Sequence, residues 1–221
     1  MAPIQLHYDD FKKIFFRDPS EPPLDEYNSP LYSLRRDINI CLNQSEKNKE
    51  IAIWPAALLI LIGIDLMSSY FPSTKITQGG KFRDFCAHFL GLNSKKRQAL
   101  WNFRCSLAHN YGLNVIIRND KYEITNTYKL GVTYEETDTE LIQSNGPDYD
   151  FLISIYILRK EFEQSIKGFQ TEMESYNCER KLYVIQTANT LNLLGWHNDC
   201  FSPSSSPCVS GSYVVPVNII E

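Results

Sequence analysis

Two stretches of this chain place an arginine five residues before a histidine. The first, FRDFCAHFLGLN, holds Arg83 and His88, and the second, FRCSLAHNYGLN, holds Arg104 and His109. A guanidinium is always charged and its planar fork fits phosphate oxygens, whereas an imidazole exchanges protons near neutral pH. Such a pair could bind and cleave a phosphodiester. The question is which stretch presents both side chains to a ligand.

Helical periodicity separates the two pairs. In the first stretch, the apolar residues cluster on one face that leaves Arg83 at its margin and His88 well away from it, which predicts two solvated side chains. In the second stretch, Arg104 lies near the middle of the apolar face. That face is marked by Leu100, Trp101, Phe103, Leu107 and Ala108. Because burying an unpaired guanidinium costs several kcal/mol, Arg104 must meet an anion or line a polar cleft.

Two interpretations of Arg104 remain open. In the functional one, His109 ends the helix, where the helix dipole favours a protonated ring and a ligand can reach it. Arg104 would then stabilise charge on the non-bridging phosphate oxygens of RNA, and His109 would pass a proton to or from the 2′-OH or the leaving oxygen, without a metal. In the structural interpretation, Arg104 pairs with a buried carboxylate such as Asp65, and His109 is a polar helix cap.

The segment WNFRCSLAHNYG, residues 101–112, resembles the signature helix of the HEPN superfamily. That motif is an Arg followed a few residues later by a His, with small and aliphatic residues between them and a turn after them. The preceding segments LIGIDLMSSYF and KFRDFCAHFL fit the same context, and a looser likeness extends over about 30–170. Cys105 follows the Arg, where members often carry Asn, Asp or His.

The resemblance implies an all-α bundle that dimerises and brings two Arg–His motifs into one cleft. Many HEPN proteins are metal-independent endoribonucleases of toxin–antitoxin and other defence systems, and others are inactive scaffolds or partner modules. On this chain it implies Arg104 and His109 as catalytic residues, with Asp65 and Asn110 in support. Tyr111 completes the Arg-x4-His-x-Tyr pattern of members that a nucleotidyltransferase modifies with AMP, although an aromatic residue that packs the turn is the alternative.

We therefore expect a homodimeric endoribonuclease, a toxin or defence protein that cleaves RNA and is controlled by an antitoxin such as a nucleotidyltransferase or another small protein. The alternative is a non-catalytic HEPN-like interaction or regulatory module, or a partner protein that binds nucleotides in the same cleft. We expect no cofactor and no metal. His197, Cys200 and Cys208 fit no standard zinc spacing.

The composition of the chain limits the kinds of protein that it can be. The net charge of −4 argues against a broad, non-specific nucleic-acid binder, but it is compatible with a small basic patch. The start of the chain lacks the layout of a secretory signal, so the six cysteines are expected to be free thiols. The most apolar run, IAIWPAALLILIGI, is shorter than the roughly 20 residues of a membrane-spanning helix. It predicts a buried core helix in a cytoplasmic protein without membrane association.

The predicted fold is all-α, a HEPN-like helical bundle with a small β-hairpin inserted after the motif helix. Apolar periodicity and capping residues predict helices over 31–48, about 55–70, 80–91, 94–110, 147–175 and 179–194. Alternation on both sides of Asn119-Asp120 predicts the hairpin, with GVTYEE as a candidate third strand. We expect an N-terminal arm over 1–29, a helical domain over 30–194 with the β insertion at about 113–134, and a tail over 195–221.

Overall fold

The computed structural model describes residues 7–22, 29–47, 52–109, 114–118, 124–134, 140–143 and 148–191. Its helices are α1 (Tyr8–Phe15), α2 (Pro30–Lys47), α3 (Ile53–Tyr70), α4 (Gln78–Phe89), α5 (Ser94–His109), α6 (Ile155–Glu174) and α7 (Cys178–Leu191). Its strands are β1 (Asn114–Arg118), β2 (Ile124–Thr133), β3 (Glu140–Gln143) and β4 (Asp148–Ser154).

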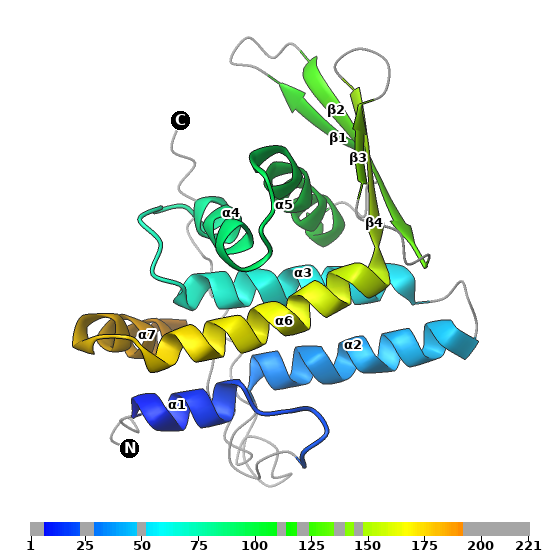
Figure 1. Cartoon of the computed structure of the whole chain (residues 1–221). Helices are drawn as coiled ribbons and strands as arrows, with labels where there is room; N and C mark the ends of the chain where they lie inside the picture. Colours follow the sequence, from blue (N-terminus) through cyan, green and yellow to red (C-terminus); the bar gives the residue numbers. More distant parts are fainter. Residues whose placement is uncertain are drawn as a thin grey trace, which may run out of the picture.

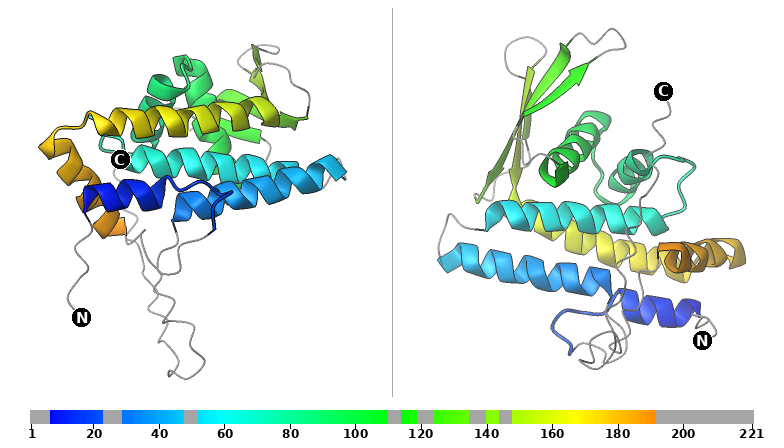
Figure 2. Two further views of the ribbon diagram at one scale, coloured as in Figure 1. Left: turned by 60° about the horizontal axis from the view of Figure 1, so that its bottom comes forward. Right: turned by 180° about the vertical axis from the view of Figure 1, so that it is seen from behind.

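Helix α3 is the centre of the molecule. It contacts α2, α4, α5, α6, α7 and β2, and Figure 1 shows α2 on one side of it and α4 and α5 on the other. Figure 2 shows the same layers from two further directions, with α6 beside α3. Among the described residues, α3 is the one helix long and apolar enough to cross a membrane, but 61% of it is buried inside the protein. The prediction of a buried core helix is therefore confirmed.

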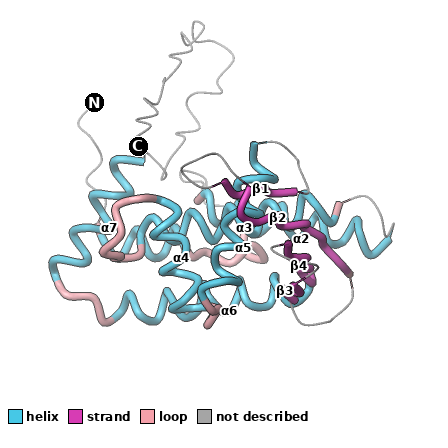
Figure 3. Tube along the Cα trace, turned by 90° about the horizontal axis from the view of Figure 1, so that it is seen from above, coloured by secondary structure: helices cyan, strands magenta, loops and turns pink. Residues whose placement is uncertain are grey.

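The strands form one mixed sheet over an end of the bundle. The strand order is β1-β2-β4-β3, in which β2 and β4 pair in parallel and the two outer pairs are antiparallel. Figure 3 shows the sheet gathered at one end of the helices. Strand β4 leads directly into α6, because Ser154 ends the strand and caps the helix, its Oγ accepting a hydrogen bond from the Ile157 amide at 3.4 Å.

The mostly helical character predicted from the sequence is confirmed, and five of the six predicted helices are present within a few residues of their predicted ends. Asn93 caps α5, its Oδ1 accepting from the Lys96 amide at 3.0 Å. The predicted hairpin is also present, since β1 and β2 pair antiparallel.

The β insertion is larger than predicted. The helix predicted over 147–175 begins only at Ile155, because the residues before it form β4. This segment alternates as a strand does: Phe151 and Ile153 are buried, whereas Leu152 between them is 38% exposed. The start of GVTYEE continues β2 to Thr133 rather than forming a separate strand, and β3 was not predicted.

The segment predicted as an N-terminal arm contains a helix that packs on the core. In α1, Phe11 and Phe15 are fully buried, and their rings lie 5.1 and 4.9 Å from the ring of Tyr70 in α3. The predicted tail, 195–221, lies outside the described residues.

The close packing of α3 on α6 generates a stability prediction. A Cβ at Gly63 would lie 2.5 Å from Cζ of Phe162, a ring with no exposed surface. We expect Gly63→Ala to lower the free energy of unfolding by about 1–3 kcal/mol in denaturant titration, even though alanine is the better helix former. Gly168→Ala in α6 is the matched control, because its Cβ would be 3.2 Å from Phe89. Equal effects of the two changes would contradict this account of the packing.

Candidate functional site

Arg104 in α5 meets Asp65 in α3. Its Nη2 lies 2.6 Å from Oδ2 of the carboxylate, and the two side chains are 22% and 10% exposed. Arg104 therefore faces the core helix and finds an anion there, as its place on the apolar face required. Both interpretations of the sequence named Asp65, as a structural partner or as a supporting residue, so the pair alone does not choose between them.

The Asp65 carboxylate is held from a second side by Gln78, the first residue of α4. Nε2 of Gln78 donates to Oδ1 of Asp65 at 2.7 Å and to its backbone oxygen at 3.1 Å. The hydroxyls of Ser68 and Ser69 donate to the same backbone oxygen, at 2.7 and 3.2 Å. Each carboxylate oxygen thus has its own partner, Arg104 on one and Gln78 on the other. Three helices meet at one buried charge.

Gln78 was not predicted from the sequence as a site residue. Nothing in TQGG identifies a glutamine that reaches another helix, because the contact depends on how α3 and α4 pack. The sequence feature closest to Gln78 is the helix cap before it. Thr77 caps α4, its Oγ1 accepting from the Gly80 amide at 3.2 Å, and this cap makes Gln78 the first residue of the helix.

The rest of the Arg104 guanidinium is only partly engaged. Its carbon lies 5.5 Å from the ring of Trp101, which is close enough for a cation–π contact. Among the residues that the structure describes, its Nε has no hydrogen-bond partner, although the atom is buried. Trp101 also packs on Gly79, where a Cβ would lie 2.7 Å from the indole. Trp101 is thus a packing residue that brings the start of α4 close to α5.

The residue after the motif arginine is a neutral thiol. Burial raises the pKa of Cys105, and the neighbouring Arg104 offsets only part of that rise. The thiol therefore stays protonated at neutral pH and adds no charge beside the Arg104–Asp65 pair. Of the six cysteines, the four in the described part of the chain are in no disulfide there, as expected: Cys41, Cys86, Cys105 and Cys178.

The similar stretch in α4 makes different contacts. His88 is exposed, as predicted, but it is not simply solvated: its Nε2 lies 2.6 Å from Oε2 of Glu172 in α6, and its ring packs against Phe71 and Phe89. Arg83 is half-buried at the margin of the helix, and its backbone oxygen accepts from Arg97 at 3.4 Å. These contacts tie α4 to α5 and α6 and form no Arg–His site.

The remaining predicted residues are placed only in part. His109 is the last residue of α5, and its side chain lies outside the described part of the structure, as do Asn110 and Tyr111. The catalytic and supporting roles of these residues remain predictions. His197, Cys200 and Cys208 also lie outside the described residues, and within these residues no group of three metal-binding side chains occurs.

The buried pair predicts a stability cost that a surface pair does not have. Asp65→Asn keeps the shape of the side chain but leaves the guanidinium of Arg104 facing the core without an anion. We expect a loss of about 1–3 kcal/mol in the free energy of unfolding, measured by chemical denaturation. Asp37→Asn is the matched control, because it removes the same charge from an exposed pair in which Nη2 of Arg36 lies 2.9 Å from Oδ1 of Asp37. It should lower the free energy of unfolding by less than about 1 kcal/mol. If the two changes cost the same, Asp65 is not the required partner of Arg104.

Scans of the chain against models of protein families, against curated proteins and against solved structures found no match. The evidence for a function therefore comes from the contacts of Arg104, Asp65 and Gln78. The likeness to HEPN proteins remains a resemblance of sequence.

Proposed function

We propose that this protein is a metal-independent endoribonuclease of the HEPN type, in which Arg104 binds the phosphate to be cleaved and His109 transfers protons. The observation that carries the proposal is the partial exposure of Arg104. Asp65 holds its Nη2, but the side chain is still 22% exposed. The exposed part of such a guanidinium can donate hydrogen bonds to phosphate oxygens.

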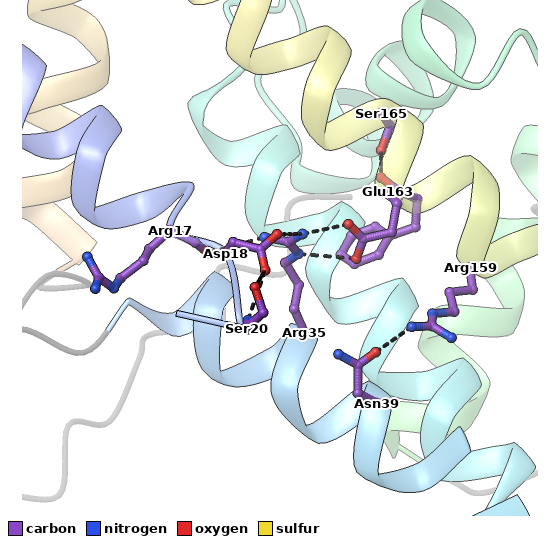
Figure 4. Close-up of polar contacts among 9 residues, drawn as sticks. Arg17, Asp18, Ser20, Arg35, Asn39, Arg159, Glu163 and Ser165 are labelled. Atoms are coloured by element: carbon purple, nitrogen blue, oxygen red, sulfur yellow. Dashed lines mark hydrogen bonds and ion pairs between the residues drawn. The ribbon is translucent and has the colours of Figure 1, made fainter. Parts of the chain in front are cut away.

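Another arginine of this protein, Arg35, has a purely structural role, since all three of its guanidinium nitrogens donate hydrogen bonds within the protein. Arg35 of α2 donates from Nε and Nη2 to the two oxygens of Glu163, at 3.1 and 2.7 Å, which makes a complete fork. Its Nη1 donates to the Arg17 backbone oxygen at 3.2 Å, and Nη2 also reaches Asp18 at 3.4 Å. Figure 4 shows this arginine enclosed by its partners. Its side chain is 8% exposed, against 22% for Arg104. The contrast supports a role for Arg104 beyond packing.

The proposed reaction uses RNA as its own nucleophile. The 2′-oxygen bonds to phosphorus and loses its proton, the bond from phosphorus to the 5′-oxygen breaks, and the 5′-oxygen takes up a proton. His109, at the end of α5, would serve one of these proton transfers. Arg104, one and a half turns earlier, would stabilise charge on the non-bridging oxygens. The product carries a 2′,3′-cyclic phosphate.

The wider setting follows from the sequence resemblance. The protein would act as a homodimer in the cytoplasm, with two α5 helices presenting two Arg–His pairs to one RNA, and it would serve as a toxin or defence protein. An antitoxin, such as a nucleotidyltransferase acting on Tyr111, would control it.

The nuclease proposal predicts RNA cleavage in EDTA with 2′,3′-cyclic phosphate ends. Arg104→Ala and His109→Ala should each lower the cleavage rate by about a hundredfold or more, because they remove charge stabilisation and proton transfer. Arg83→Ala and His88→Ala are matched controls from the similar stretch in α4 and should cleave at the wild-type rate. Cleavage by His109→Ala at the wild-type rate would remove His109 from the mechanism.

A non-catalytic interaction module is the second candidate. It is favoured by the overall charge of −4 and by Asp65, which already neutralises Arg104. Such a module would cleave no RNA and would purify in a stable complex with another protein. Growth arrest on expression, relieved by Arg104→Ala, would rule this candidate out.

A further inference from the structure

We infer that Arg97, two turns before Arg104 on α5, is a second phosphate-binding residue, which holds the RNA backbone beside the phosphate to be cleaved. The inference rests on the proposed nuclease function, because it concerns how the substrate of that reaction is bound. It assigns a role to a residue outside the Arg-x4-His motif. It also implies that the preferred substrate has at least one phosphate besides the cleaved one.

The charge of α5 differs from that of the chain as a whole. The helix contains four cationic residues and no Asp or Glu, whereas the chain has a net charge of −4; the four are Lys95, Lys96, Arg97 and Arg104. Three of them lie in the first turn, where the helix dipole favours acidic side chains such as Asp9 and Asp10 in α1. Local helix stability therefore does not explain these cations. A basic helix in an acidic protein is typical of a surface that binds nucleic acid.

Arg97 and Arg104 lie on the same side of α5. Seven residues are close to two full turns, so the two positions differ by about 20° around the helix axis and by about 10 Å along it. This side faces α4, because Nη1 of Arg97 donates to the backbone oxygen of Arg83 at 3.4 Å. Trp101, between the two arginines, packs on Phe82 of α4 with ring centroids 5.2 Å apart. One phosphate is too small to reach both positions, so Arg97 holds a different phosphate of the same RNA.

Arg97 forms no ion pair with any residue that the structure describes. Four other arginines each pair with a carboxylate: Arg17, Arg35, Arg36 and Arg104. The side chain of Arg97 is partly exposed, and its one hydrogen bond goes to the uncharged backbone oxygen of Arg83. Its Nε is buried, so a phosphate binds through the terminal nitrogens and not through Nε. A phosphate oxygen there supplies the anion that the described residues do not.

Binding of a 2′-O-methyl RNA, which cannot be cleaved, tests the inference without catalysis. Each phosphate contact with a single strand steepens the plot of log Kd against log salt concentration by about 0.7. Arg97→Gln should reduce the slope by about this amount and weaken binding roughly fivefold at low salt, whereas Arg97→Lys should keep the wild-type slope. Arg36→Gln is the matched control, because it removes the same charge from a 55% exposed side chain of α2. It should leave the slope unchanged.

The length of a cleavable substrate separates phosphate binding from a structural role. A dinucleoside monophosphate contains only the phosphate to be cleaved. Arg97→Gln should therefore leave its kcat/KM within about twofold of wild type and lower that of a longer RNA roughly fivefold. A merely structural residue would affect both substrates alike.

Equal losses on the two substrates, a wild-type salt slope in Arg97→Gln, or a wild-type protein that binds no RNA would each overturn the role of Arg97. RNA binding that depends on Arg97 without cleavage of either substrate would overturn the nuclease proposal alone.

Discussion

A buried carboxylate in the central helix needs a cation, and much of the structure around α5 follows from this requirement. Asp65 lies in a helix whose other buried side chains are nearly all apolar or small, and it is only 10% exposed. An unpaired charge there would cost several kcal/mol. Arg104 supplies the cation from α5, and Gln78 supplies a donor from α4. Asp65 therefore links α3 to both α4 and α5 through polar contacts, beside the apolar core that the three helices share.

The molecule uses arginine in two ways on opposite sides of this helix. On the α2 side, Arg35 is enclosed by Glu163, Asp18 and a backbone oxygen, and it ties α2 to α6. On the side of α4 and α5, Arg104 pairs with Asp65, and its side chain is 22% exposed against 8% for Arg35. Figure 2 shows that α2 and the α4–α5 pair lie on different faces of α3. The more exposed of the two arginines belongs to the helix that ends in His109, as the proposed nuclease function requires.

The sequence predicted those features that depend on local pattern. The periodicity of apolar residues located the core helix and α5, and the place of Arg104 on an apolar face predicted an anion or a polar cleft beside it. It could not predict β4, because a short apolar run before a helix reads equally well as the first turns of that helix. The parallel pairing of β2 with β4 and the reach of Gln78 to Asp65 depend on packing between distant segments, which no local pattern encodes.

The account depends on Arg104 being open to a phosphate in the folded protein. The most direct measurement is titration of the protein with a 2′-O-methyl RNA, which can bind but cannot be cleaved, while the side-chain N–H signals of Arg104 and Arg35 are followed by NMR. The account predicts that the Arg104 signals shift in proportion to bound RNA and that those of Arg35, closed by its fork, do not. RNA binding that leaves the Arg104 signals unchanged would contradict it.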